Sequence, residues 1–252
     1  MNPEERKSEI LRILEQKDAV KIAELSKVLK VSRETVRKYL YELEEEKLIK
    51  KIHGGAILDT SNQETDYDRR MTNQEESKLL IAKQALSYIE EGDTIYLDYG
   101  TTIYQLAKHL KKISNITVVT NSIPIVNLLL RYENVNVIIL GGVLRRNEGS
   151  LFGALATNSM DKIFVDIGFF GCGGIDIKNG ITNFHMDEVE VSRKMIFQSQ
   201  TSIFMADKSK FGTTALNKVA NFSEIDIIIT DKKLGESDQK EISDQYTVIN
   251  MV

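Results

Sequence analysis

The sequence predicts a two-domain α/β protein, in which a small helical domain with a β-hairpin precedes a larger domain built on a doubly wound parallel sheet. Helical spacing of apolar residues dominates the first part of the chain, and β-branched runs alternate with amphipathic helices in the second part. A polar stretch without periodicity separates the two. With 252 residues, 42% of them hydrophobic, the chain is long enough for a small and a medium core. We expect domains at 1–58 and 76–252, joined by a linker at 59–75.

Three helices are predicted in the first domain. Apolar residues recur at steps of three and four over about Pro3–Gln16, over Ile22–Leu29, and again after Ser32, which is a typical N-cap residue. The link Lys30–Val31 is too short for the second and third helices to lie antiparallel with full overlap. The two helices are therefore expected to cross steeply, as in a helix-turn-helix.

The third helix is basic at its start and acidic farther along, where Glu42, Glu44, Glu45 and Glu46 follow. Although the net charge is −4, the first 60 residues carry 13 Lys+Arg and 12 Asp+Glu, a balance of +1. Clustering on one face matters more for DNA than the average charge, because one face makes the phosphate contacts. Short hydroxyls and a helix N-terminus suit phosphate oxygens, and arginines reach guanine edges in the major groove.

A β-wing is predicted at Leu48–Ile57, as two short strands around a turn, and it adds basic residues beside the third helix. Double-stranded DNA is therefore the expected partner of the first domain, in preference to a three-helix adaptor with a solvated basic face. The residues expected to contact DNA are Ser32, Arg33, Glu34, Thr35, Arg37, Lys38, Lys50, Lys51, His53 and Gly54.

The second domain begins with a β-α-β-α-β pattern. Its strands are predicted at Thr94–Leu97, Ile116–Thr120, Val135–Leu140, Ile163–Phe170, Ser202–Ala206 and Asp226–Thr230, and its first helices at Thr102–Leu110 and Ile123–Leu130. Strands that are apolar on both faces and alternate with helices are typical of a parallel sheet covered on both sides.

Polar and glycine-rich segments follow five of these strands, and such sheets bind ligands at the carboxyl ends of their strands. The segment Asp98–Thr102 opens a helix, so its free amides and threonine hydroxyls favour an anion. We predict a ligand cleft at this edge rather than a set of unrelated turns. Its candidate residues are Asp98, Gly100, Thr101, Thr102, Asn121, Ser122, Gly141, Gly142, Arg145, Gly173, Glu188, Lys208 and Lys210.

The segment Val31–Arg37, together with Leu40, Leu43 and His53–Ala56, resembles the signature of the DeoR family of bacterial sugar-metabolism repressors. The sequence departs from that signature at Lys38 and Tyr39, where the family usually has Arg-Asp. The resemblance extends over nearly the whole chain. It includes Arg70–Lys78, Asp98–Thr102, Thr120–Ser122, Leu140–Gly142, Asp207–Gly212 and Thr230–Asp231.

This resemblance implies a repressor whose sensor domain is similar in fold to ribose-5-phosphate isomerase. It also implies an inducer that is a phosphorylated sugar or polyol. The loop at Thr101–Thr102 would then hold the phosphate, with Lys208 and Lys210 as partners for oxygen atoms and Glu188 for a sugar hydroxyl. The alternatives without a role in effector binding are that the two lysines are solvated surface charges and that Glu188 is an acid that stabilises a helix N-terminus.

An active sugar-phosphate isomerase with a DNA-binding appendage is the competing function. Such an enzyme needs a carboxylate base, and the isomerase family places its carboxylates in the loop that corresponds to Gly168–Gly174, where this chain has none. Cys172 has no histidine in an obvious partnering position, so we expect a small packing residue rather than a nucleophile. A nucleotide switch is disfavoured because neither phosphate-loop nor dinucleotide-binding glycine motifs occur. We therefore expect a sensor without catalysis.

Other classes are excluded by composition. Five charges among the first ten residues argue against a signal peptide, and no uncharged apolar run approaches the length of a membrane span. A single cysteine rules out a disulfide framework, and the three histidines lack metal-ligand spacing. We expect a cytoplasmic protein without cofactor or metal. Because one recognition helix makes few base contacts, we expect a homo-oligomer, either a dimer or a tetramer.

Overall fold

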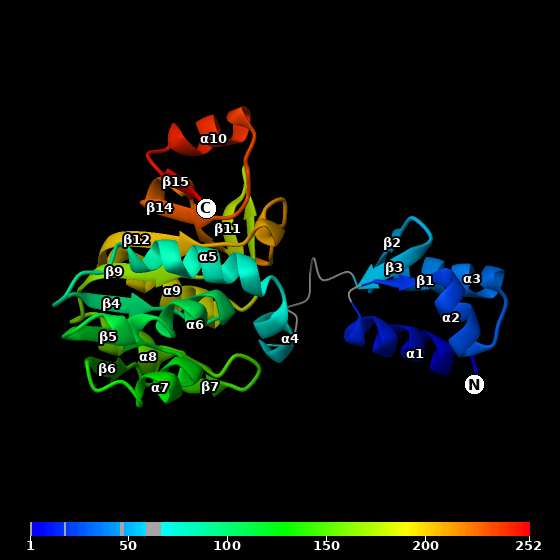
Figure 1. Cartoon of the computed structure of the whole chain (residues 1–252), viewed down its shortest axis with the longest axis horizontal. Helices are drawn as coiled ribbons and strands as arrows, with labels where there is room; N and C mark the ends of the chain where they lie inside the picture. Colours follow the sequence, from blue (N-terminus) through cyan, green and yellow to red (C-terminus); the bar gives the residue numbers. More distant parts are fainter. Residues whose placement is uncertain (1, 18, 46–47, 59–66) are drawn as a thin grey trace. The chain divides into compact units, whose positions relative to one another are not determined.

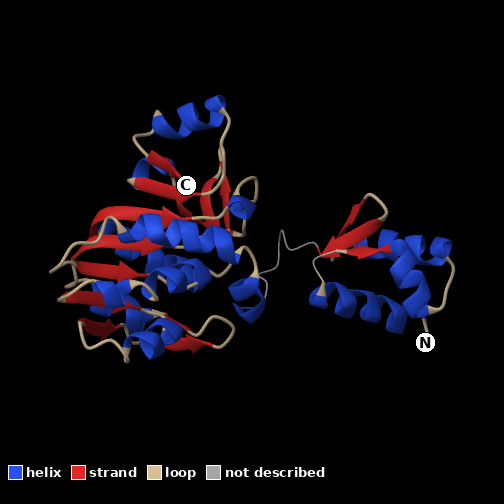
Figure 2. Ribbon diagram, viewed as in Figure 1, coloured by secondary structure: helices blue, strands red, loops and turns tan. Residues whose placement is uncertain are grey.

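The computed structural model describes residues 2–17, 19–45, 48–58 and 67–252 (Figures 1 and 2). The chain divides into two compact units, Met1–Glu64 and Thr65–Val252. Of the linker predicted at 59–75, residues 59–66 lie outside the described residues. The rest of it contains helix α4 (Tyr67–Thr72), in which no residue is buried as a whole. The short helix therefore has no apolar periodicity by which the sequence would reveal it.

The first unit contains three helices, α1 (Pro3–Gln16), α2 (Ile22–Leu29) and α3 (Arg33–Glu45). Asn2 and Glu5 form a capping box at the start of α1, and Lys30 ends α2 in the left-handed conformation (φ 54°). The predicted wing is present as β2 (Ile49–Ile52) and β3 (Gly55–Leu58). The short strand β1 (Val20–Lys21) joins it in a sheet of order β1-β3-β2. Val36, Leu40 and Leu43 of α3 pack with residues of α1, α2 and β2 in one core.

Gly55 lies where two strands of this sheet come very close. A Cβ added at Gly55 would lie 2.2 Å from the carbonyl oxygen of Val20, which is backbone and unable to swing away. We therefore expect Gly55→Ala to destabilise the first unit by about 1–3 kcal/mol, the usual cost of overpacking. Thermal unfolding followed by circular dichroism measures the effect. Gly54→Ala is the steric control, because no atom lies within 4 Å of its added Cβ, although its φ of +80° adds strain.

The second unit is built on a seven-stranded parallel sheet of order β15-β14-β12-β9-β4-β5-β6. Its strands are β4 (Thr94–Leu97), β5 (Ile116–Thr120), β6 (Val135–Ile139), β9 (Val165–Phe170), β12 (Ser199–Met205), β14 (Ile227–Thr230) and β15 (Val248–Met251). Within β4, Tyr96 belongs to one hydrophobic core, and Ile95 and Leu97 belong to another. The sheet therefore has a packed core on each face, which confirms the predicted fold class.

Two layers of helices cover this sheet (Figure 2). Helices α5 (Glu75–Leu86), α6 (Thr101–Ala107) and α7 (Ile123–Leu129) supply one core, whereas α8 (Ala154–Met160), α9 (Met186–Phe197) and α10 (Glu236–Ser243) supply the other. Helix α6 ends three residues earlier than predicted, and a 3-10 turn at Leu110–Lys112 follows it. Strand β6 is less buried than its apolar sequence predicts, because it is an edge strand and leaves Ile138 and Ile139 exposed.

Two small antiparallel sheets were not predicted. One consists of β10 (Gly174–Asp176), β11 (Gly180–Asn183) and β13 (Asn217–Ala220), and the other is the hairpin of β7 (Val143–Arg145) and β8 (Ser150–Phe152). The loop of this hairpin, at 146–149, carries Glu148 into the interior, where the residue is only 1% exposed. The hairpin loop thus places a buried carboxylate that the sequence did not indicate.

Candidate functional site

Helix α3 presents a basic, exposed N-terminal end. Ser32 caps the helix: its Oγ accepts a hydrogen bond from the amide of Thr35 at 3.1 Å and lies 2.8 Å from the Thr35 hydroxyl. Arg33, Arg37 and Lys38 are exposed, while Val36 on the opposite face is fully buried. The arrangement holds the basic face outward by burying the other side of the same helix.

Two salt bridges on α3 involve residues expected to contact DNA. Arg37 donates to Glu34 at 3.0 Å, with 61% and 81% of the two side chains exposed, and Lys38 lies 3.9 Å from Glu42. Exposed pairs of this kind contribute about 0–1 kcal/mol, so exchange of Glu34 for a DNA group at Arg37 costs little.

The wing places its basic residues unequally. Lys51 is bound to α3: its Nζ lies 2.6 Å from Glu44 and 4.8 Å from the ring centre of Tyr41. Lys50 and His53 are exposed, and Gly54 forms the turn with φ +80°. Of the predicted wing residues, Lys50, His53 and Gly54 are thus placed at the surface, and Lys51 is held against the helix.

Tyr39, where the sequence departs from the family signature, has a structural role. Its side chain is buried in the core of the first unit, and its hydroxyl accepts a hydrogen bond from Arg6 at 3.3 Å. Tyr39 therefore connects α3 to Arg6 of α1, and the sequence did not indicate a role for Arg6.

In the second unit, the strand order reverses between β4 and β9, and Asp98 lies at that point. The chain runs from β4 to β5 and β6 on one side, and from β9 to β12, β14 and β15 on the other. The amide of Asp98 donates to the carbonyl of Phe169, so the ends of the two strands are tied together. Crevices at such reversals are the usual ligand sites of open α/β sheets.

Asp98 and Asn121 belong to one buried hydrogen-bond network. The Tyr96 hydroxyl lies 3.2 Å from Asp98 Oδ1 and 3.2 Å from Asn121 Oδ1, and Ser192 donates to Asp98 Oδ2 at 2.9 Å. A hydroxyl has one proton, so Tyr96 donates to only one of these acceptors at a time. A neutral Asp98 carboxyl resolves the conflict, because it is able to donate to Tyr96 while Tyr96 donates to Asn121.

Burial raises the pKa of Asp98 to about 7, although hydrogen bonds that Ser192, Tyr99 and Tyr96 donate to the ionised carboxylate act to lower it. Between about pH 4 and pH 7 the folded protein keeps this proton while the unfolded chain loses it. The stabilising contribution of Asp98 is therefore complete below pH 4 and is lost as the pH rises to 7, by at most about 1.4 kcal/mol per pH unit. The difference in unfolding free energy between the wild type and Asp98→Asn, measured by denaturant titration at several pH values, is expected to show this slope. A difference that does not vary with pH would contradict it.

Glu188 and Arg145, predicted separately, form a buried ion pair. Glu188 is fully buried in the first turn of α9, and its carboxylate accepts hydrogen bonds from Arg145 of β7 and from the Ser150 hydroxyl of β8. The Ser192 hydroxyl that donates to Asp98 also lies 3.2 Å from the Glu188 carbonyl, so its one proton is shared between the two acceptors. The structure thus brings Asp98, Asn121, Glu188 and Arg145 into one network, with Ser150 and Ser192 as members that the sequence did not indicate.

The predicted glycines differ in what surrounds them. A Cβ at Gly142 would lie 2.6 Å from the carbonyl oxygen of Phe152, and one at Gly173 would lie 2.7 Å from the Phe184 ring, so packing explains both. Gly100 (φ +110°) and Gly141 have no atom within 4 Å of an added Cβ. Open space therefore adjoins Gly100, immediately before the buried Thr101 and Thr102 of α6.

Lys208 and Lys210 form a second group at the ends of β12 and β14. Lys208 is exposed, its amide donates to Asp231 at 2.7 Å, and its Nζ lies 3.9 Å from the same carboxylate. Lys210 ends the 3-10 turn that Asp207 caps. No hydrogen bond among the described residues connects these lysines to the Asp98 network.

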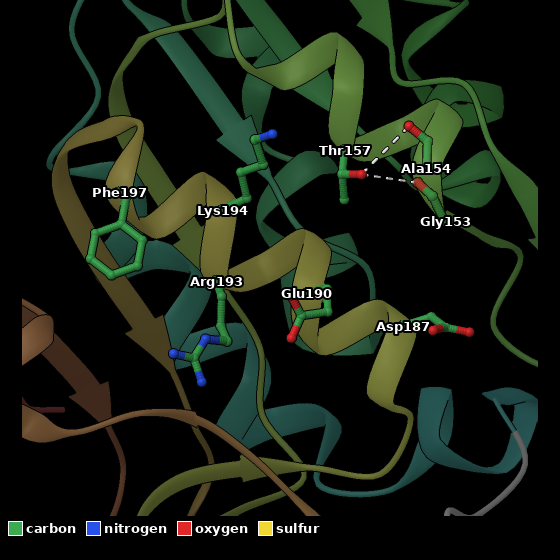
Figure 3. A pocket seen from close by; sticks show the side chains of 8 residues that line it. All are labelled: Gly153, Ala154, Thr157, Asp187, Glu190, Arg193, Lys194 and Phe197. Atoms are coloured by element: carbon green, nitrogen blue, oxygen red, sulfur yellow. Dashed lines mark hydrogen bonds between the residues drawn. The ribbon is translucent and has the colours of Figure 1, made fainter.

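The groove shown in Figure 3 lies elsewhere, between α8 and α9. It has a volume of about 570 Å³ and is lined by Gly153, Ala154, Thr157, Asp187, Glu190, Arg193, Lys194 and Phe197. None of the residues predicted for the ligand cleft lines it. The groove therefore does not bring the predicted residues together, and a ligand site at the strand ends stays a prediction.

Cys172 has the environment of a packing residue. Its side chain packs against the core of the second unit, and burial raises the pKa of its thiol to about 12. A thiol with that pKa is not ionised near neutral pH and is a poor nucleophile. Among the described residues, no group of His, Cys, Asp and Glu is arranged to hold a metal ion, and no helix is long and apolar enough to cross a membrane.

Family models match both parts of the chain. The DeoR-like helix-turn-helix domain matches residues 6–62, and the DeoR C terminal sensor domain matches residues 73–232. Three curated relatives are similar over most of their lengths. They are the HTH-type transcriptional regulator GolR of Listeria innocua (33% identical, covering 97% of this chain and 96% of the relative), the HTH-type transcriptional repressor GlcR of Bacillus subtilis (37%, 92% and 90%) and the glycerol-3-phosphate regulon repressor of Escherichia coli (31%, 100% and 100%).

Among solved structures, a D-ribose-5-phosphate isomerase in complex with phospho-erythronic acid is similar to the chain. The TM-score is 0.42 and the sequence identity 22%, over 56% of this chain and 55% of that one. A likeness of this size has no bearing on activity.

Proposed function

The chain belongs to the DeoR family of transcriptional regulators, and from this premise we propose that it represses a sugar- or polyol-catabolic operon and leaves its operator when a phosphorylated intermediate binds the sensor domain. The chain is a regulator and not an enzyme, as the absence of a carboxylate from Gly168–Gly174 led us to expect. The alternative of an active isomerase with a DNA-binding appendage is not favoured.

The exposed basic end of α3 carries the DNA-binding half of this proposal. Its N-terminal turn offers arginines to base edges and the Ser32 cap to phosphates, while the buried face fixes its orientation. Lys50, His53 and Gly54 of the wing are placed to add backbone contacts. A catabolic operon as the target is supported by the similarity to the glycerol-3-phosphate regulon repressor of Escherichia coli.

The strand ends of the second unit support the effector half. Thr101 and Thr102 are buried beside the open space at Gly100, and the amides of the first turn of α6 precede its first internal hydrogen bond, from Tyr104 to the Gly100 carbonyl. Amide and hydroxyl donors at one point suit a phosphate. The remaining part of the effector would find hydrogen-bonding groups on Asn121, Ser122, Arg145 and Glu188. We include Lys208 and Lys210, which follow β12, as cations that would bind oxygen atoms of the effector.

We also propose a cytoplasmic homo-oligomer, either a dimer or a tetramer. A subunit with one recognition helix contacts few base pairs, and two symmetry-related helices on repeated half-sites provide the affinity that a regulator needs.

Thermal-shift screening of the full chain against phosphorylated sugars and polyols tests the effector half. A specific effector raises the unfolding midpoint, because binding to the folded state alone stabilises it, and the unphosphorylated form of the same compound is the matched control. One phosphorylated compound is expected to stand out from its unphosphorylated form. Equal shifts with both forms, or conversion of the compound into an isomer, would refute the proposal.

A further inference from the structure

Helix α4 lies at the candidate cleft and is the first described element of the second unit. Figure 1 shows it at the end of the sheet to which the strand arrows point. The Tyr67 ring lies 5.7 Å from the Arg70 guanidinium on the same helix. Burial and the nearby carboxylate of Glu148 raise the pKa of the Tyr67 hydroxyl. Helix α4 packs against α6, the helix that begins at Thr101.

Arg70 anchors α4 to the hairpin of β7 and β8. Its guanidinium forms an ion pair with Glu148, a carboxylate 1% exposed in the hairpin loop, and its carbonyl accepts a hydrogen bond from Lys78 of α5. Lys78 is itself buried and also donates to the Asn73 carbonyl at 2.7 Å. The same hairpin holds Glu188 on its other side, through Arg145 and Ser150. One loop thus connects α4 to the predicted effector residues.

Two buried hydroxyl groups, one on α4 and one beside the hairpin of β7 and β8, lack a partner among the described residues. Ser122 is 1% exposed and forms a β-bridge with Ser150, two residues from Glu148, yet its Oγ has no hydrogen-bond partner in the part of the chain that the structure describes. The same holds for the buried Tyr67 hydroxyl oxygen. Buried polar groups are nearly always hydrogen-bonded, so two unsatisfied hydroxyls, on the helix and next to the hairpin that the Arg70–Glu148 ion pair joins, point to a polar ligand that satisfies them.

We propose that Arg70, Tyr67 and Ser122 bind the anionic group of the effector, which takes the place of Glu148 at the Arg70 guanidinium. The inference rests on the proposed function and adds to it residues of α4, for which no role was predicted. A guanidinium binds a phosphoryl group with the same N–H donors that bind a carboxylate, so a phosphoryl oxygen is able to accept the hydrogen bond that Glu148 accepts from Arg70. Helix α4 is the first described element after the segment that joins the two units. Replacement of Glu148 by the effector anion would therefore change the contacts of the sensor helix that is nearest in sequence to the first unit.

Titration of the full chain with inorganic phosphate, followed by the shift in unfolding midpoint and by phosphorus NMR, tests this proposal. Glu148→Gln removes the competing carboxylate and is expected to tighten phosphate binding about tenfold or more, whereas Arg70→Gln abolishes it. Glu190→Gln, on an exposed position of α9, is the matched control and leaves the affinity unchanged. Ser122→Ala and Tyr67→Phe are expected to weaken binding without lowering stability, because each removed hydroxyl has no hydrogen bond to lose.

The outcomes separate this inference from the proposed function. Phosphate binding that survives Arg70→Gln and Ser122→Ala but is lost in Thr101→Asp overturns the role of α4 and keeps the effector site. Failure of Glu148→Gln to tighten binding, in a variant whose circular dichroism shows it to be folded, also overturns it. If neither phosphate nor any phosphorylated compound binds the wild type, both the inference and the proposed effector are wrong.

Discussion

Replacing Arg37 by alanine is expected to weaken operator binding by roughly 1–3 kcal/mol, the usual cost of losing one base-reading arginine. Arg37 is exposed at the start of α3, and its salt-bridge partner Glu34 is more exposed still. The fold of the first unit therefore does not depend on the pair, and the loss falls on DNA binding. Fluorescence anisotropy with an operator selected from a random duplex pool measures the effect.

Arg12→Ala is the matched control for Arg37→Ala. Arg12 forms the same kind of i,i+3 salt bridge, with Glu9 at 2.6 Å, but on α1, away from the predicted reading helix. Operator affinity unchanged by Arg37→Ala, or lowered equally by Arg12→Ala, would remove Arg37 from the interface. A base contact should also relax sequence preference, whereas Lys50→Ala is expected to weaken all duplexes alike and to lower the salt dependence by about one unit.

Thr101→Asp is expected to abolish the response to the effector while leaving operator affinity intact. The side chain at 101 is 5% exposed in the first turn of α6, so an aspartate there places a negative charge where the phosphate is proposed to lie. Repulsion between the two anions is poorly screened at a buried position and opposes binding. An acid in the first turn of a helix is itself favourable, which helps the variant to fold.

Release of the operator by the compound that gives the largest thermal shift measures the effect of Thr101→Asp. Thr157→Asp is the control, since Thr157 lines the groove between α8 and α9 (Figure 3) and is expected to leave the response unchanged. A normal response of the Thr101 variant would disprove the phosphate site at α6. Loss of the response in the Thr157 variant alone would move the effector to the groove.

The first unit was largely predictable from the sequence because its signals are local. Val36, Tyr39, Leu40 and Leu43 repeat at helical spacing, and Ser32 caps the helix that they define. Strand β1 was missed because two residues carry no periodicity, and its pairing with β3 joins positions more than thirty residues apart.

The second unit was predictable in its central strands and less so at its cleft. Runs such as Ile116–Thr120 are apolar on both faces, and only a parallel sheet buries both. By contrast, β11 pairs with β13 across more than thirty residues and has no alternating pattern. The pairing of Arg70 with Glu148 and of Glu188 with Arg145 and Ser150 also depends on tertiary contacts, which no sequence spacing reveals. Glu148 in particular lies in a polar turn sequence that predicts an exposed loop, whereas the residue is buried.

The central claim is that ligand binding in the second unit controls DNA binding by the first. Operator affinity of the full chain, measured against increasing concentrations of the stabilising phosphorylated compound, tests it most directly. We expect the compound to weaken operator binding and operator DNA to weaken binding of the compound by the same factor, because the coupling is reciprocal. An operator affinity that stays constant while the sensor domain becomes saturated would contradict it.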